Sequence, residues 1–331
     1  MNPKKSEALV MKNRVCEILG VKYPIIEGGM AYVGNGALAA AVSNGGGFGQ
    51  IGSAGRSLEN FEEEILIAAK LTRQPFGVNL PISEHKDNQP YIDIVEKHKD
   101  KIKAISISSG NPRDFIPKFK DMGLIVMALT ATCKHAMKAK EYGADIIVSE
   151  GYEAGGHNGS AEMTTFALIP QIKNIVNLPI VAAGGIMDGR GMVAAMALGA
   201  DAVQLGTRFV ATKECEAHYN YKQILVDAHD DATIVLTRKI GGVIRVLKTE
   251  HVLSVQEIDQ HSSTVEEILP YVRGTENKKA ALEGDFQNGW ASAGQGVGLI
   301  KSIESAEDVV KSIVKEANQV INELKQVGAC I

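Results

Sequence analysis

Short apolar runs alternate with longer amphipathic segments through the first two-thirds of this 331-residue chain. Such runs are typical of parallel strands buried on both faces, and the segments between them have the spacing of helices that cover a sheet. Eight runs precede residue 206, and a barrel of parallel strands closes at eight. The alternation therefore predicts an α/β fold, a TIM (β/α)8 barrel, with an open doubly wound sheet as the alternative. The expected strands are residues 24–27, 47–52, 77–81, 104–108, 124–129, 145–149, 179–183 and 202–205.

The helices between these strands are predicted from apolar spacing and from capping residues. The clearest amphipathic pattern covers residues 58–71. Ser305, with Asp308 in the first turn, predicts the start of a last, long helix. The glycines at 45–47 precede a strand instead of following one, so they predict a helix end and a turn. The expected helices are residues 37–43, 58–71, 91–99, 113–122, 134–142, 166–176, 191–198 and 306–325.

The alternation breaks between residues 212 and 300, where apolar and polar residues are mixed. We expect this segment to be a mostly helical cap over the barrel mouth, inserted before the last barrel helix. The predicted division is therefore a barrel formed by residues 14–211 and 301–328, and a smaller cap region formed by residues 212–300.

Composition excludes several classes of function. A formal net charge of −4 offers no basic surface for nucleic acid. No apolar stretch approaches the roughly 18 residues of a membrane span, and residues 1–14 lack the apolar core of a secretory signal. We therefore expect a cytoplasmic protein with reduced thiols and no metal site. The cysteines are far apart, at Cys16, Cys133, Cys215 and Cys330.

One histidine, His157, lies in the glycine-rich run 150–159 directly after the sixth expected strand. Active sites of such barrels lie on the loops after the strands. Glycines on both sides let a ligand approach the imidazole closely. The alternative is a loop histidine that contacts only water.

Two glycine signals close the expected barrel. Gly184 and Gly185 follow the seventh strand, and Gly206 with Thr207 follows the eighth. Many barrels of this type hold phosphate at this place, and the helix expected to begin near Asp188 would add a favourable dipole. The alternative is a pair of tight turns without a ligand.

Further small and polar residues follow other strands. Gly28 and Gly29 after the first strand would let a flat ring approach the backbone, and the Asn79 amide could bond to a heterocycle. A turn and a capping side chain are the alternatives for these positions. Asn111 and residues 130–132 are weaker candidates, because turn chemistry accounts for them almost as well.

Five motifs occur together in one order along the chain. They are Pro24-Ile-Ile-Glu-Gly-Gly-Met30, Phe76-Gly-Val-Asn79, residues 150–159 around Ala154-Gly-Gly-His-Asn-Gly159, Ala183-Gly-Gly-Ile186 with Asp188-Gly-Arg-Gly191, and Gln204-Leu-Gly-Thr-Arg-Phe209. This set resembles the nitronate monooxygenase family, formerly called 2-nitropropane dioxygenases, which also contains FMN-dependent enoyl-acyl-carrier-protein reductases. The resemblance extends from about Arg14 to the last helix.

The resemblance implies a TIM barrel that binds FMN at its mouth, with His157 at the catalytic position beside the flavin. It places the phosphate on Gly185, Gly206 and Thr207. The implied contacts to the ring and ribityl chain come from Gly28, Gly29, Met30, Asn79, Glu150, Gly155, Gln204 and Leu205.

The chain departs from the family pattern at two places. The family commonly has glutamine where Glu27 stands. One monooxygenase class has Cys-Ala before its histidine and Pro-Gly-Glu after it, where this chain has Gly155-Gly156 and Asn158-Gly159-Ser160. The Gly-Gly form is shared with the enoyl reductases.

Three functions follow. The first is oxidation of alkyl nitronates by oxygen with FMN, and the second is reduction of an enoyl thioester by FMN and NAD(P)H. The third is a barrel that binds a phosphorylated ligand without redox chemistry. The expected partners are a small-molecule substrate (a nitronate or an enoyl thioester), NAD(P)H for the reductase and a second copy of the chain in a homodimer. Neither nucleic acid nor a membrane is an expected partner.

Overall fold

The computed structural model describes residues 13–82, 87–262 and 264–328. The polar start of the chain, on which the absence of a secretory signal was argued, lies mostly outside this range, as does Cys330. Within the described part, no helix combines the length and the apolar character that crossing a bilayer requires. Cys16, Cys133 and Cys215 are free thiols.

Eight parallel strands form the centre of the molecule, in the order β1-β9-β8-β6-β5-β4-β3-β2. A bridge between Ile26 and Phe48 brings the first and second strands together, so the sheet closes nearly into a barrel. This confirms the predicted TIM barrel and excludes the open sheet. The strands are β1 (Ile25–Glu27), β2 (Gly49–Gly52), β3 (Phe76–Pro81), β4 (Ala104–Ser108), β5 (Ile125–Thr130), β6 (Ile146–Glu150), β8 (Ile180–Ala183) and β9 (Ala202–Leu205).

Helices surround the barrel, each within two residues of its predicted range at both ends. They are α2 (Gly36–Asn44), α3 (Leu58–Leu71), α4 (Gln89–Lys97), α5 (Phe115–Asp121), α6 (Cys133–Glu141), α7 (Thr165–Ile175), α8 (Gly189–Ala197) and α14 (Ala306–Val327). Ser305 caps α14 as predicted, because its hydroxyl accepts from the Asp308 amide at 3.1 Å. The predicted turn after α2 is also confirmed, with Gly45 as the cap and Gly46 at φ +95°.

Helix α1 (Arg14–Leu19) covers the amino-terminal end of the barrel. Val15 and Leu19 pack against apolar side chains inside the barrel, such as Phe48 and Met127. Arg14 also forms an ion pair of 2.8 Å with Asp201, just before β9. This end is closed by packing, so a ligand has access only from the carboxyl ends of the strands.

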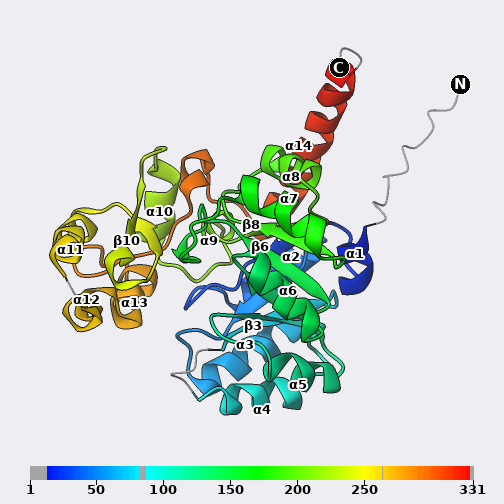
Figure 1. Cartoon of the computed structure of the whole chain (residues 1–331), viewed down its shortest axis with the longest axis horizontal. Helices are drawn as coiled ribbons and strands as arrows, with labels where there is room; N and C mark the ends of the chain where they lie inside the picture. Colours follow the sequence, from blue (N-terminus) through cyan, green and yellow to red (C-terminus); the bar gives the residue numbers. More distant parts are fainter. Residues whose placement is uncertain (1–12, 83–86, 263, 329–331) are drawn as a thin grey trace, which may run out of the picture.

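Residues 212–300 lie to one side of the barrel, in yellow and orange in Figure 1, while α14 projects in another direction. The helices here are α10 (Tyr219–Asp227), α11 (Glu250–His261), α12 (Val265–Val272) and α13 (Gly274–Glu283), with short turns η1 (Arg238–Ile240) and η2 (Gln295–Leu299). They pack partly on a separate apolar cluster that includes Val252, Ile268 and Trp290. We propose, as the sequence predicts, that residues 212–300 form a cap region.

The prediction of a mostly helical segment missed a small sheet. Strands β10 (Thr233–Leu236) and β11 (Ile244–Leu247) form an antiparallel hairpin, and β7 (Gly156–His157) from the barrel loop adds a third strand. Ile244 pairs with His157 and Arg245 with Gly156. The runs are short, and β7 depends on a partner almost 90 residues away, so no local pattern predicts it.

Candidate active site

A cavity of about 610 Å³ lies at the carboxyl ends of the barrel strands, beneath the cap region. Its volume is within the range of small-molecule and cofactor sites, about 300–1,000 Å³. Eleven of the twelve predicted site residues line it, although they come from five separate parts of the chain. They are Gly28, Gly29, Met30, Asn79, Glu150, Gly155, His157, Gly185, Gln204, Gly206 and Thr207.

Leu205 is the exception. Its side chain is buried in the hydrophobic core, and its carbonyl accepts a hydrogen bond of 2.9 Å from the Gly28 amide. Successive side chains of a strand point to opposite faces. Because Gln204 lines the cavity, the next side chain, that of Leu205, points away from it. Leu205 therefore positions the Gly28 loop and does not line the cavity.

Glycine is required at two positions of the cavity wall. A Cβ on Gly29 would lie 2.2 Å from Cγ of Asn79. Gly184 has φ +95°, and a Cβ there would lie 2.6 Å from the Gly151 carbonyl oxygen. Side chains at these positions would displace the walls, so the glycines keep the backbone close to whatever occupies the cavity.

Gln204, which lines the cavity, belongs to a buried polar cluster with Glu27 and Gln50. The Gln50 amide nitrogen Nε2 donates to the Glu27 carbonyl at 2.6 Å and to Gln204 Oε1 at 3.4 Å. Burial raises the pKa of Glu27 well above its usual value, while the Gln50 backbone amide, which donates to its carboxyl at 3.1 Å, acts in the opposite direction.

The amides at the start of α8 already have partners, and the favourable dipole expected there from the sequence stays a prediction. The Asp188 carboxylate accepts from the amides of Arg190 and Gly191 at 3.0 and 3.1 Å. The Gly189 amide donates to Glu316 at 2.8 Å. Because carboxylates already occupy these donors, the remaining backbone candidates are the turns at Gly184, Gly185 and Gly206.

His157 lies at the wall of the cavity, held by the pairing of β7 with β11. Its side chain is exposed and lines the cavity. Desolvation by the surrounding protein lowers the pKa of His157. The imidazole is therefore neutral at pH 7. A neutral imidazole can donate one hydrogen bond and accept another.

Glu150, at the end of β6, lies on the same wall. Among the described residues its carboxyl forms neither an ion pair nor a side-chain hydrogen bond, and burial raises the pKa of Glu150 to about 8. This carboxyl keeps its proton at neutral pH. The cavity thus contains a neutral base and a protonated acid.

The cap region supplies a wall that the sequence did not predict residue by residue. Arg273 and Asn277, at the junction of α12 and α13, line the cavity together with Trp290, the only tryptophan of the chain. The Tyr221 hydroxyl donates to the Ser292 carbonyl and fixes two of these segments together. No motif marks these residues, because only the folding of the cap brings them to the barrel.

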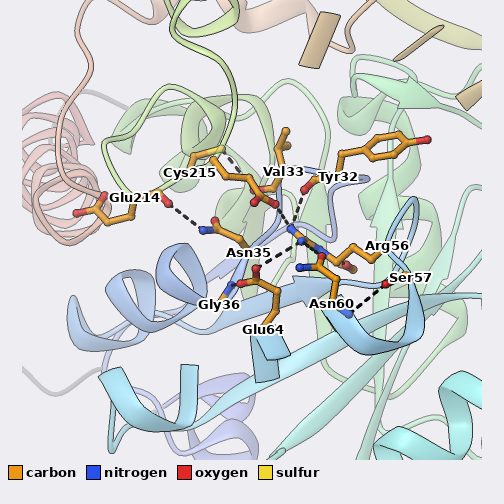
Figure 2. A network of polar contacts seen from close by, with 12 residues as sticks. Tyr32, Val33, Asn35, Gly36, Arg56, Ser57, Asn60, Glu64, Glu214 and Cys215 are labelled. Carbon is orange, nitrogen blue, oxygen red and sulfur yellow. Dashed lines mark hydrogen bonds and ion pairs between the residues drawn. The ribbon is translucent and has the colours of Figure 1, made fainter. Parts of the chain in front are cut away.

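A buried cluster around Arg56 joins the cap region to the barrel (Figure 2). The Arg56 guanidinium donates to the Tyr32 carbonyl at 2.6 Å, lies 3.6 Å from the Glu64 carboxylate and forms an ion pair with Glu216. Tyr32 belongs to the loop after β1, and its hydroxyl donates to the Gly274 carbonyl at 2.8 Å. One arginine therefore holds a cavity loop and the first residues of the cap in place.

The weaker sequence candidates lie elsewhere. Asn111 accepts from the Arg113 amide at 3.2 Å, as in a turn, and Thr132 caps α6 by accepting from the His135 amide at 3.2 Å. Asn111, Thr130 and Ala131 line a neighbouring cavity and not the first one. Turn chemistry accounts for Asn111 and Thr132.

The cavity suits a flat cofactor with a phosphate. Glycine backbone forms part of its wall, the amide side chains of Asn79 and Gln204 line it, and no ion pair of the described residues joins two of its lining residues. Gly185, at φ +75°, and Gly206 lie where strands β8 and β9 end, the usual phosphate position in such barrels. FMN is compatible with these residues.

Comparisons with known proteins agree with this geometry. The nitronate monooxygenase family model matches residues 12–316. A probable nitronate monooxygenase from Staphylococcus saprophyticus is 32% identical, covering 94% of this chain and 99% of its own. An indene-carboxyl-CoA dehydrogenase from Rhodococcus jostii is 29% identical, with 95% and 98% covered.

Among solved structures, FabK from Thermotoga maritima aligns with a TM-score of 0.88 and 36% identity, covering 96% of this chain and 99% of its own. The similarity extends over barrel and cap together. It leaves no support for a barrel without redox chemistry. The chain is an oxidoreductase and belongs to the nitronate monooxygenase family.

Proposed function

We propose that this protein is an FMN-dependent reductase of enoyl thioesters that uses NAD(P)H. Members of its family depend on flavin in general. The observation that carries the choice of reaction is that Glu150 and His157 line the same cavity, where burial raises the pKa of Glu150 to about 8. Reduction of a conjugated double bond needs a proton for the carbon next to the carbonyl, and Glu150 holds one at neutral pH.

The residues of the cavity have distinct parts in this reaction. FMN, when bound, carries two electrons from NAD(P)H to the substrate as hydride. We assign Gly28, Gly29 and Asn79 to the ring, and Gly185, Gly206 and Thr207 to the phosphate. His157 donates a hydrogen bond to the thioester carbonyl, and Glu150 supplies the proton and regains one from water.

Similarity supports the same choice. FabK, an enoyl-acyl-carrier-protein reductase, is 36% identical to this chain, and the 29% identical dehydrogenase also acts on a thioester, a carboxyl-CoA. The Gly155-Gly156-His157 form agrees with the reductase branch of the resemblance.

Nitronate oxidation, which the sequence favoured, is the second candidate. A neutral His157 can accept a proton next to a nitro group or bond to the nitro oxygens, and the 32% identical relative is a probable nitronate monooxygenase. In this reaction the substrate reduces the flavin and oxygen takes up the electrons. The reaction therefore needs no proton from Glu150.

A stopped-flow experiment separates the two. The FMN-loaded enzyme is mixed anaerobically with NADH, NADPH or propyl nitronate, and the reduced enzyme is then mixed with a crotonyl thioester or oxygen. We expect bleaching by NADH or NADPH and rapid reoxidation by the thioester. Bleaching by the nitronate alone would replace the proposal with the second candidate.

A further inference from the structure

A second cavity, of about 460 Å³, lies beside the first. It is formed by the ends of β4 and β5, the loop that leads into α6, and residues 157–159. The two cavities share five residues of their walls. These are Ser108, Ser109, Leu129, Glu150 and His157.

The second cavity lacks the glycines of the proposed cofactor site and shares only Glu150 with the predicted cofactor residues. Gly28, Gly29, Gly185 and Gly206 line the first cavity and are absent from the walls of the second. The shared residues include the two proposed to act on the substrate. A molecule that reacts between His157 and Glu150 can therefore extend into the second cavity without displacing the flavin.

The inner wall of the second cavity is aliphatic. Ile82, Ile107 and Ala128 form it, each 2% exposed in the folded chain. The Thr130 hydroxyl, also on this wall, donates to the Val148 carbonyl at 3.4 Å, so it does not need a hydrogen-bond acceptor from a ligand. Aliphatic walls favour burial of methylene groups in proportion to their area.

The outer rim of the second cavity is polar and opens at α6. His135 and Lys138, both exposed, lie there, on the face of α6 that also carries the inward-pointing Ala139. A chain that fills the cavity has its reacting end at His157 and its far end near this rim. The cavity thus has an aliphatic inner wall, and polar or small residues line most of the rest of it.

We infer that this second cavity holds the acyl chain of the thioester substrate, beyond the double bond that is reduced. The inference rests on the proposed function and narrows it to substrates with a chain longer than crotonyl. The pantetheine arm, on the other side of the reacting carbons, is then left to the first cavity and its cap residues.

The test is a series of trans-2-enoyl thioesters from crotonyl to octenoyl on one short thiol, measured with the FMN-loaded enzyme and NAD(P)H. Each added methylene should raise kcat/KM about two- to fourfold in the wild type, as expected for burial of a methylene. Ala131, on the wall of the second cavity only, is the position at which to block it.

Ala131→Phe should remove the gain with chain length and leave crotonyl reduction within about twofold of the wild type. Ala131→Ser, which keeps the space open, is the matched control and should behave as the wild type. His135→Trp adds bulk at an exposed rim position, and it should shorten the longest chain that gains if Ala131→Phe does not fold.

Binding of the same thioesters to the oxidised enzyme, without NAD(P)H, is measured by calorimetry as an independent readout. If crotonyl is reduced but neither affinity nor kcat/KM depends on chain length, the second cavity is not the acyl site, and the reductase function stands. If no thioester is reduced, the proposed function fails. The acyl-chain inference is then overturned with it, and a gain along a series of 1-nitroalkanes, measured by calorimetry and lost in Ala131→Phe, would assign the cavity to the alkyl chain of another substrate.

Discussion

The two sides of the active-site cavity are built differently. The side to which we assign the cofactor consists of backbone at the ends of neighbouring strands, with glycines such as Gly29 and Gly184 packed against adjacent segments. The cap side consists of side chains such as Arg273, Asn277 and Trp290, brought in from the region after residue 212. One side is set by the barrel itself, and the other by a few contacts between barrel and cap.

This difference suits one side of the cavity to a cofactor and the other side to a substrate. Backbone in a closed barrel has few alternative positions, so it suits a cofactor whose shape does not vary. Side chains on a cap can change with little effect on the barrel, so they suit the variable part of a substrate.

The largest effect is expected at Arg56, where the two sides meet. Arg56→Gln removes the cation between Glu64 and Glu216, of which Glu64 is well buried. Loss of one member of a buried ion pair costs about 3–5 kcal/mol of unfolding free energy. Urea titration measures it. Arg190→Gln, at an exposed pair with Asp188, is the control and should change stability by less than about 1 kcal/mol. Equal losses in both variants would contradict a special role for Arg56.

The next effect concerns the cofactor side alone. Gly184→Ala places a methyl group 2.6 Å from the Gly151 carbonyl at a φ of +95°, so the turn must move. We expect FMN affinity to fall at least about a hundredfold, equivalent to about 2.7 kcal/mol. Gly123→Ala is the matched control, because Gly123 has φ +81° and no atom within 4 Å of the added Cβ. If Gly123→Ala lost as much FMN affinity, general backbone strain would explain the effect, and contact between FMN and the Gly184 turn would not be needed.

Glu150→Gln tests the protonated acid between the two sides. The folded pKa of Glu150 is about 8 against a usual value of 4.5, so the folded protein keeps a proton that the unfolded chain loses between these pH values. Stability of the wild type, measured without FMN, should therefore fall as pH rises from 4.5 to 8. The variant has no such proton, and its loss over this window should be about 1–3 kcal/mol smaller. Parallel pH profiles for the two proteins would show that Glu150 is ionised when folded.

The smallest effect is expected on the cap side. Tyr32→Phe removes the hydrogen bond to the Gly274 carbonyl, which is exposed, so the cost should be about 0.5 kcal/mol. Faster amide exchange should be confined to α13, which begins at Gly274. Tyr219→Phe is the control, since its hydroxyl bonds to Gln223 within α10. Faster exchange in the barrel strands of Tyr32→Phe would contradict a local contact.

The barrel could be predicted from the sequence because its strands are continuous apolar runs and its turns carry glycine. Gly28, Gly185 and Gly206 follow strands, so the topology alone brings them to one mouth. The two-residue strand β7 could not be predicted, because it exists only through pairing with Ile244 and Arg245. Trp290 and Arg273 are likewise placed by cap folding and carry no local signal.

The side-chain contacts of two residues near the site could not be predicted. Asp188 was expected at a helix start whose dipole favours phosphate, and its carboxylate bonds to the first amides of that helix, α8. Leu205 was expected at the cofactor, but it alternates with Gln204 along β9 and is buried. The position of both residues after or at the end of a barrel strand could be predicted from the sequence. The direction of their side chains could not.

The most direct measurement of the central claim, that FMN lies in the glycine-lined half of this cavity, is an equilibrium titration with FMN followed by tryptophan fluorescence. Trp290 is the only tryptophan and lines the cavity, so its emission reports on this site alone. We predict saturable quenching with one FMN per chain in the wild type and Gly123→Ala, and its loss in Gly184→Ala. Absence of saturable quenching in the wild type, or unchanged binding by Gly184→Ala, would contradict the account.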